Sequence, residues 1–367
     1  MIFKRSWLST VPVCIILLAL AFVSCHHPDD PPPPPPEPDP GKRDYVWSLD
    51  TLNHPDSYQT DMEDIWASSP TNVYVVGQND RASTGVMYRY RGAGWMPVKL
   101  HVLDGGLINT GFELHAIYGF DTARIWSVGY KLRSNPNPPP NFFDSTFIIW
   151  FDGTAWREEP MERKRGQLLA IWGANAGDVW AGGTNGNLYH YTLGTWARRR
   201  DIDSTVFVLS IRGFATDDIY MTSARSLAGP DSAGYYMVYL NHWNGQIWER
   251  VDSFANVSGV WKFGRYLLTT DGHQLLSSLY GIYRYNGGCS WSSLLQSEQP
   301  LRIQGSSSKN IYGVGDYWRV FHWNGTDWRQ IPTTITDMGL FTGVWSDNKE
   351  TFIIGHNGRV TYIMHGK

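Results

Sequence analysis

One short pattern recurs along this chain: a strand-like aromatic segment, a glycine turn and a tryptophan. The segment "HWNGTDW" begins at His322, and "HWNGQIW" begins at His242. The tryptophans that close six such turns are Trp95, Trp156, Trp196, Trp248, Trp291 and Trp328. A chain that repeats one turn at regular intervals is built from stacked copies of a single supersecondary unit. This repetition is the strongest constraint on its fold.

Two further strand-like segments precede each glycine turn. The first is apolar and ends in a β-branched residue followed by an aromatic or polar one, as in "DIWASS" at 64 and "AIWGAN" at 170. The other copies start at 116, 210, 259, 302 and 343. The second segment follows within a few residues, as in "NVYVVG" and "DVWAGG". Each unit therefore supplies four strands in about 40 to 54 residues, which is typical of a β-propeller blade.

The seventh unit lacks its last strand at the C-terminal side. Its three strands include "TFIIGH" and "RVTYIMHG", after which the sequence reaches Lys367. The missing strand is found in "DYVWSLDTL", where Trp47 has the expected position. Pairing the first strand with the last three leaves no free sheet edge. We therefore predict an all-β, seven-bladed β-propeller of four-stranded blades over residues 44–367, its last blade closed by the N-terminal strand.

The N-terminus has the features of an export signal. Lys4 and Arg5 precede an apolar run, and the segment "FVSC" ends at Cys25. This resembles a bacterial lipobox, which implies a signal peptide over residues 1–24 and a lipidated Cys25, with palmitate among the expected acyl chains. Residues 25–43 then form a Pro-rich spacer that reaches about 40 Å. Asp29 and Asp30 resemble the export signal of surface lipoproteins in the Bacteroidetes lineage. We expect an outer-membrane anchor, with exposure at the cell surface as one alternative.

The repeats also resemble known propellers. They are similar to those of the sialidase-type Asp-box group and of photosystem II assembly factors, and "YNGGCSW", with Asn286, comes nearest to an Asp-box. Such boxes are structural turns, so the resemblance implies a fold and not a reaction.

Catalysis is the alternative function that the sequence supports less well. A sialidase-like glycosidase needs several arginines, a tyrosine nucleophile and a glutamate at the axis, yet Arg212 and Arg302 are the basic residues in the first-strand segments. The blade histidines lack metal-ligand spacing, and the recurring His242 and His322 are typical of turn packing. We therefore expect no catalytic residues, no metal and no cofactor, with a glycan-active enzyme (a glycosidase or a polysaccharide lyase) as the alternative.

The favoured function is binding or scaffolding by a monomer. Without residues 1–24 the formal charge goes from −3 to −5, which disfavours nucleic acid as a partner. In propellers the ligand-facing surface is usually made by the loops between the second and third strands (B–C) and between blades (D–A). The B–C loops here differ far more between blades than the strands do, so we expect the ligand on that face. The candidate binding residues are Asp271, His273, Asp316, Tyr317 and Trp318. The expected partners are the membrane, through Cys25, and a polysaccharide or envelope protein.

Overall fold

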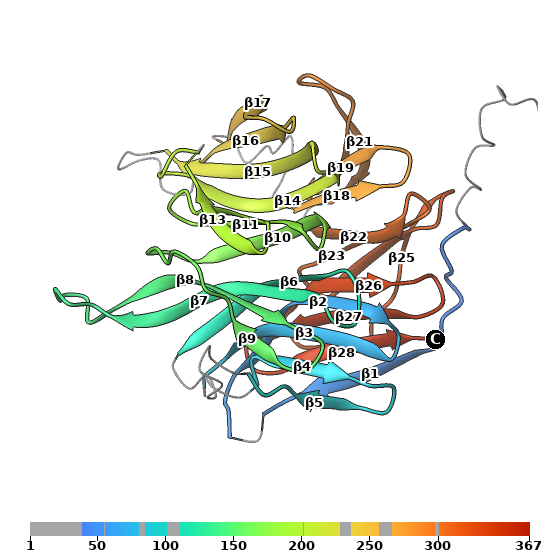
Figure 1. Ribbon diagram of the computed structural model, residues 1–367. Helices are drawn as coiled ribbons and strands as arrows, with labels where there is room; N and C mark the ends of the chain where they lie inside the picture. The colour runs from blue at the N-terminus through green and yellow to red at the C-terminus, as the bar shows by residue number, and fades with distance from the viewer. Residues whose placement is uncertain are drawn as a thin grey trace, which may run out of the picture. The chain divides into compact units, whose positions relative to one another are not determined.

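The computed structural model describes residues 39–54, 56–80, 85–100, 111–200, 202–227, 236–256, 266–297 and 301–367. The signal peptide, Cys25 and nearly all of the spacer lie outside these residues. The described residues form 28 strands in seven four-stranded antiparallel sheets (Figure 1). They include no helix, and hence no helix that could span a membrane. The prediction of a seven-bladed β-propeller is therefore confirmed.

We name the strands of each blade A to D from the axis outward. Blade 1 contains β2 (Thr60–Ser69), β3 (Asn72–Asn79), β4 (Met87–Tyr90) and β5 (Trp95–Pro97). Blade 2 contains β6 (Phe112–Gly119), β7 (Ile125–Ser134), β8 (Phe142–Phe151) and β9 (Trp156–Glu158). Blade 3 contains β10 (Leu168–Asn175), β11 (Asp178–Gly183), β12 (Leu188–Thr192) and β13 (Thr195–Arg199). Blade 4 contains β14 (Phe207–Ala215), β15 (Asp218–Ser226), β16 (Tyr236–Trp243) and β17 (Trp248–Asn256).

The remaining blades follow the same order, except at the seam. Blade 5 contains β18 (Tyr266–Thr270), β19 (Gln274–Leu279), β20 (Gly281–Tyr285) and β21 (Trp291–Gln296). Blade 6 contains β22 (Leu301–Ser307), β23 (Asn310–Gly315), β24 (Arg319–Trp323) and β25 (Trp328–Gln330). Blade 7 contains β26 (Leu340–Ser346), β27 (Thr351–His356), β28 (Thr361–Gly366) and, as strand D, β1 (Trp47–Leu52).

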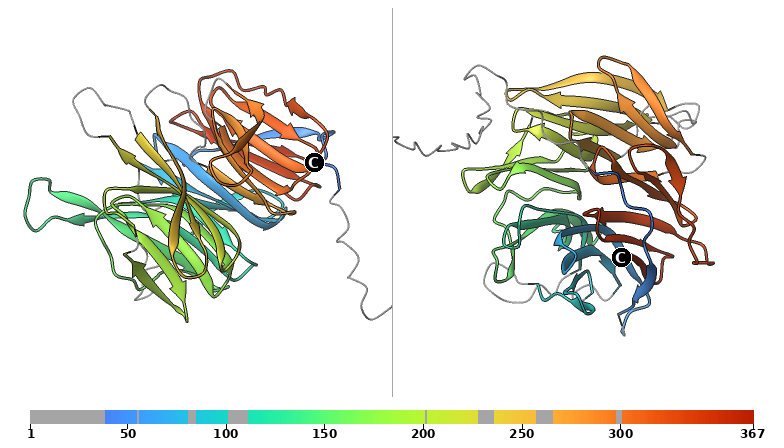
Figure 2. Two further views of the ribbon diagram at one scale, coloured as in Figure 1. Left: turned by 90° about the horizontal axis from the view of Figure 1, so that it is seen from above. Right: turned by 90° about the vertical axis from the view of Figure 1, so that its right-hand side faces the viewer.

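The A strands form a closed ring around the axis. Each contacts the A strand of the next blade, from β2 through β6, β10, β14, β18, β22 and β26 back to β2 (Figure 2). Successive strands are antiparallel, so the A–B and C–D turns share one end of this ring and the B–C and D–A loops share the other. We call these the A–B end and the B–C end.

The seam closes as the sequence predicts. Strand β1 pairs antiparallel with β28, which places Trp47 opposite Gly366 and Thr51 opposite Tyr362. Trp47 is only partly buried, although we expected a buried side chain. It packs against the core cluster that includes Phe341. This pairing covers the edge of β28, and β1 becomes the outer strand of blade 7, as strand D is in the other blades.

The C–D turns explain the recurring glycine. In blades 1, 2, 4 and 6 the turn glycines Gly92, Gly153, Gly245 and Gly325 have φ between 87° and 93°, a region that a Cβ disfavours. In blade 6 the side chain of Asn324 accepts the backbone N–H groups of Thr326 and Asp327, at 3.0 and 3.1 Å. These residues therefore define a turn, as the structural reading of the Asp-box implies.

The closing tryptophans join neighbouring blades. In blade 2, Trp156 pairs across the turn with Phe151, and the ring of Trp156 meets Tyr74 of blade 1 at 5.7 Å between ring centroids. In blade 4, Trp248 meets Trp180 of blade 3 at 5.4 Å. Large aromatic side chains stabilise such interfaces by burying apolar area between sheets. Each blade thus completes the core of the one before it.

Blade 5 departs from the sequence interpretation. We expected "GVWKFG" at 259 as its A strand and "YLLTTD" as its B strand. Instead β18, which contains "YLLTT", is the A strand and contacts β14 and β22 on either side. The segment at 259 lies outside the described residues. Gly272, with φ of 75°, and His273, with φ of 56°, form the A–B hairpin turn, so the Asp-Gly pair at 271 was the signal for this register.

Candidate functional site: the axial cavities

The five candidate binding residues do not converge. Asp271 and His273 lie in the β18–β19 turn at the A–B end, where Asp271 accepts the backbone N–H of Ser308 and His273 stacks on Phe214. Asp316, Tyr317 and Trp318 follow β23, whereas Ser308 precedes it. The two groups thus occupy opposite ends of the ring. The prediction that these residues converge was wrong, because the A strand of blade 5 is the segment that the sequence interpretation had assigned to strand B.

Trp318 belongs to the hydrophobic core. It is 3% exposed, and its ring lies 5.0 Å from that of Phe341 in the next blade. Its indole N–H donates to the carbonyl oxygen of Asp337 at 2.6 Å. Tyr317 beside it is 57% exposed. The indole therefore packs blade 6 on blade 7, and Tyr317 presents the free aromatic surface at this loop.

The recurring histidines also have a structural role. In three blades an imidazole of strand C bonds a side chain at the start of strand B and stacks on the aromatic ring two residues later. These triplets are His190–Asp178–Trp180, His242–Asp218–Tyr220 and His322–Asn310–Tyr312. The distance from Nε2 of the imidazole to Oδ1 of the aspartate or asparagine is 2.6 to 2.8 Å. The prediction that His242 and His322 pack turns is therefore confirmed, and the described residues hold no group of three or more potential metal ligands.

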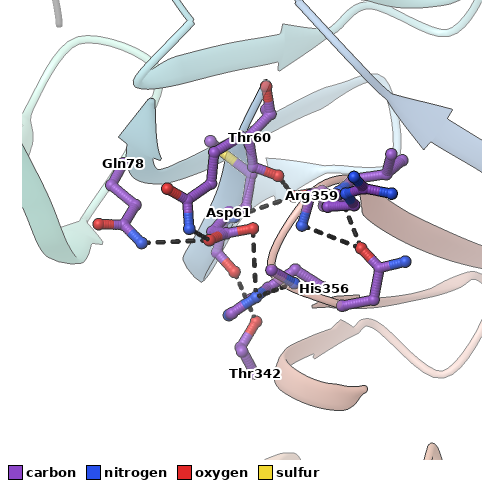
Figure 3. A network of polar contacts seen from close by, with 12 residues as sticks. Thr60, Asp61, Gln78, Thr342, His356 and Arg359 are labelled. Carbon is purple, nitrogen blue, oxygen red and sulfur yellow. Dashed lines mark hydrogen bonds and ion pairs between the residues drawn. The ribbon is translucent and has the colours of Figure 1, made fainter. Parts of the chain in front are cut away.

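A polar network joins blade 7 to blade 1 (Figure 3). His356 of β27 contacts two carboxylates of β2, with Nδ1 3.3 Å from Asp61 and Nε2 3.4 Å from Glu63. Burial would lower the pKa of His356, but these two contacts raise it to about 9. Thr361 donates to the carbonyl oxygen of Thr60 at 2.7 Å. These bonds tie the last blade to the first.

Arg302 extends this network to the axis. Its Nη1 donates to the carbonyl oxygens of Glu63 and Thr342, both at 2.7 Å, and its Nη2 lies 2.9 Å from Oε2 of Glu63. Its guanidinium also lies 5.0 Å from the ring centroid of Tyr266. The pKa of Glu63, which burial would raise, is held well below its usual range by His356 and Arg302. Arg302 therefore has partners from three other blades.

A small cavity of about 70 Å³ lies beside Arg302 on the axis. Its lining includes Asp64, His115, Arg212 and Tyr266. Asp64 accepts the backbone N–H groups of Ile65 and Ile117 at 2.9 and 3.0 Å. Burial nevertheless raises the pKa of the Asp64 carboxyl, against those bonds and the charge of Arg212. This cavity is polar but has room for little more than water.

A larger cavity, of about 310 Å³, lies at the A–B end of the axis. We call it the aromatic mouth. Four A strands each contribute one aromatic side chain to it, and these are Trp66, Tyr118, Trp172 and Trp345. Blades 4 and 6 contribute Arg212 and Gln304 at the same position of their A strands, and Gly305 and Ser306 at its edge are exposed. Arg212 is the one charged residue among the described residues that line it.

Glycines of the next blade allow two of these indoles to lie close to the backbone. A Cβ on Gly119 would lie 2.7 Å from Trp66, and one on Gly213 would lie 2.6 Å from Trp172. Both distances are shorter than a real side chain permits. The sequence contains a signal for the aromatic mouth, because an aromatic or polar residue follows the β-branched residue in the A strands of six blades. We did not identify this position as part of a cavity from the sequence, since nothing in the neighbouring residues shows that it faces the axis.

The fold places the protein among seven-bladed β-propellers. No family model and no curated protein matches the chain. A solved structure described as YCF48 bound to D1 peptide is similar, with 16% identity and a TM-score of 0.57, over 89% of this chain and 99% of that one. The WD40 β-propeller domain of Doa1 is similar at 13% identity and a TM-score of 0.55, over 87% of this chain and 97% of that one. A catalytically inactive virginiamycin B lyase from Staphylococcus aureus with quinupristin shares 11% identity at a TM-score of 0.58, over 87% of this chain and 99% of that one. At these identities the likeness extends to the fold alone.

Proposed function

We propose that this protein is a non-catalytic binding or scaffolding protein of the bacterial envelope, held by a lipid at Cys25, that takes its ligand at the aromatic mouth. The observation that carries the proposal is the meeting of four aromatic side chains with Arg212 in one open cavity. Ligand sites are typically concave and mostly apolar, with a few convergent polar groups. The proposal moves the expected site from the B–C end to the A–B end.

The contacts of the axial charged groups favour binding over catalysis. The arginine and glutamate that a sialidase-like site would use here bond each other, because Arg302 bonds the side chain of Glu63 as well as two carbonyl oxygens. A glycosidase needs two carboxyl groups facing a substrate across its scissile bond. Here Glu63 faces His356 and Arg302. One of the similar structures is described with a bound peptide, which accords with binding as a use of this fold.

The test measures binding and turnover together. The purified protein is mixed with envelope polysaccharides and extracts, and bound material and any cleavage products are both quantified. We expect saturable binding that changes tryptophan fluorescence, with no product. Glycan cleavage that disappears in Glu63→Gln or Tyr266→Phe would establish the enzyme alternative instead. Binding unaffected by substitution of Trp345 would place the site elsewhere.

A further inference from the structure

We infer that the aromatic mouth binds a uronic acid residue of a saccharide, with its sugar ring on the aromatic walls and its carboxylate at Arg212. This inference rests on the proposed function and specifies its ligand. The aromatic side chains form the walls of the mouth. A pyranose ring has apolar C–H faces and polar edges, so flat aromatic side chains with a few polar groups between them suit it. Trp66, Tyr118 and Trp345 are partly exposed and offer such faces.

Arg212 gives the cavity its charge preference. The hydrogen bonds that the structure gives this guanidinium both use Nη1, which donates to the carbonyl oxygens of Ile211 at 2.7 Å and Ile171 at 3.5 Å. A guanidinium presents five N–H donors in a planar fork that matches a carboxylate. The donors on Nε and Nη2 therefore remain for a ligand. Because aromatic and aliphatic side chains form part of the surrounding walls, an ion pair formed here is stronger than one in water.

Asp64, the carboxylate whose charge acts on Arg212, does not take this role. Burial lowers the pKa of Arg212, and the charge of Asp64 opposes this shift. The oxygens of Asp64, however, bond the backbone N–H groups of Ile65 and Ile117. Asp64 lines the small axial cavity and is absent from the residues that line the mouth. A ligand carboxylate would thus meet Arg212 from the mouth without facing a competing anion among the described lining residues.

Gln304 completes the polar side of the mouth. Its Oε1 accepts the backbone N–H of Val344, so its amide nitrogen keeps two donors for a sugar hydroxyl or carboxylate. Thr269 already donates to the carbonyl oxygen of Gly213 at 3.0 Å. Arg212 and Gln304 thus keep donors that the fold does not use, and the positive charge of Arg212 favours an anionic, acceptor-rich ligand over a neutral one.

The experiment compares one sugar with and without its charge. Digalacturonic acid and its dimethyl ester have the same rings, but the ester carries no carboxylate. Titration of the purified protein, followed by calorimetry and tryptophan fluorescence, should show the acid binding about tenfold or more tightly than the ester. Arg212→Gln should remove this preference by weakening binding of the acid to about the affinity of the ester.

Two further variants separate charge from folding. Gln304→Glu keeps the acceptor for Val344, adds a negative charge and removes the two amide donors, so it should weaken binding of the acid much more than binding of the ester. Arg329→Gln removes an exposed arginine of β25 and should change neither. A thermal melt for each variant shows whether the fold is intact.

Each outcome decides between the proposals. Equal binding of acid and ester would overturn the uronic acid inference and leave the mouth as a binding site. Binding of neither sugar, with Arg212-dependent binding of a peptide through its terminal carboxylate, would also overturn it. If neither sugar nor peptide binds, and an envelope ligand binds without regard to Arg212 and Trp345, the mouth itself fails as the site.

Discussion

Nε2 of His356 lies 3.4 Å from Oε1 of Glu63, and this ion pair links the last blade of the ring to the first. His356 is on β27 and Glu63 is on β2, so the pair forms only when the ring is closed. It supplements the backbone pairing of β1 with β28 on the outer side of the same blade. The last blade is therefore fixed in two places, by the ion pair to the first blade near the axis and by the pairing of β1 with β28 at the outer edge.

The first prediction concerns pH. Contacts with Asp61 and Glu63 raise the pKa of His356 from 6.5 to about 9. Its stabilisation should be complete below pH about 6.5 and lost as pH rises through about 9, because the folded state then gives up its extra proton. The loss should be on the order of 2 kcal/mol. Urea unfolding between pH 6 and pH 10 measures it, and His356→Gln should flatten the curve. A wild-type midpoint that stays constant over this range would contradict the prediction.

The second prediction concerns the strand that closes the ring. Deletion of residues 44–52 should expose the edge of β28 and cause aggregation or edge-to-edge dimers. Trp47→Ala should cost about 2 kcal/mol, less than a fully buried tryptophan, because Trp47 is only partly buried. Light scattering reports the first effect and denaturant unfolding the second. A deletion protein that stays monomeric with an unchanged Tm would rule out this closure.

The third prediction compares two histidines with the same blade position. His322 is fully buried, and burial lowers its pKa to about 4. Stability should therefore fall as pH drops from 6.5 towards 4, because the unfolded state then binds the proton more readily. His322→Ala should cost about 2 kcal/mol and His242→Ala, which is more exposed, about 1 kcal/mol. Equal costs for both variants would contradict this ranking.

The fourth prediction separates the core residue from the exposed one at the β23–β24 loop. Trp318→Ala should destabilise the protein by about 3–5 kcal/mol, as expected for a buried tryptophan. Tyr317→Ala should change stability by less than about 0.5 kcal/mol, as is usual at the surface. Thermal unfolding of the two variants provides the comparison. A Trp318→Ala protein that kept its Tm and lost ligand would restore this loop as a candidate site.

The fifth prediction concerns the anchor. If Cys25 carries a lipid, Cys25→Ser should release the protein from membranes and abolish labelling by a fatty-acid probe. Cys289→Ser is the matched control, because Cys289 is an exposed cysteine of the β20–β21 turn. Cell fractionation measures both variants. Unchanged membrane partition of Cys25→Ser would defeat the lipoprotein interpretation.

The repeated signals along the chain were enough to predict the number of blades and the closure. Six blades carry their own C–D turn, with a glycine such as Gly245, which has a positive φ, and a tryptophan such as Trp248 that starts strand D. These signals are local, because backbone conformation at a turn depends on the residues within it. The closing strand was predictable for the same reason, since Trp47 repeats the pattern in the place where the seventh copy lacks it.

The tertiary structure decided which residues meet. Alternation along a strand separates its two faces, but it does not show which strand is nearest the axis, and so the A strand of blade 5 was misplaced. That error put Asp271 and Trp318 at one end of the ring, whereas they occupy opposite ends. Arg212 and Trp345 come together only because the ring closes, bringing equivalent positions of different blades around one axis. Contacts of this kind depend on the whole ring, and no local pattern encodes them.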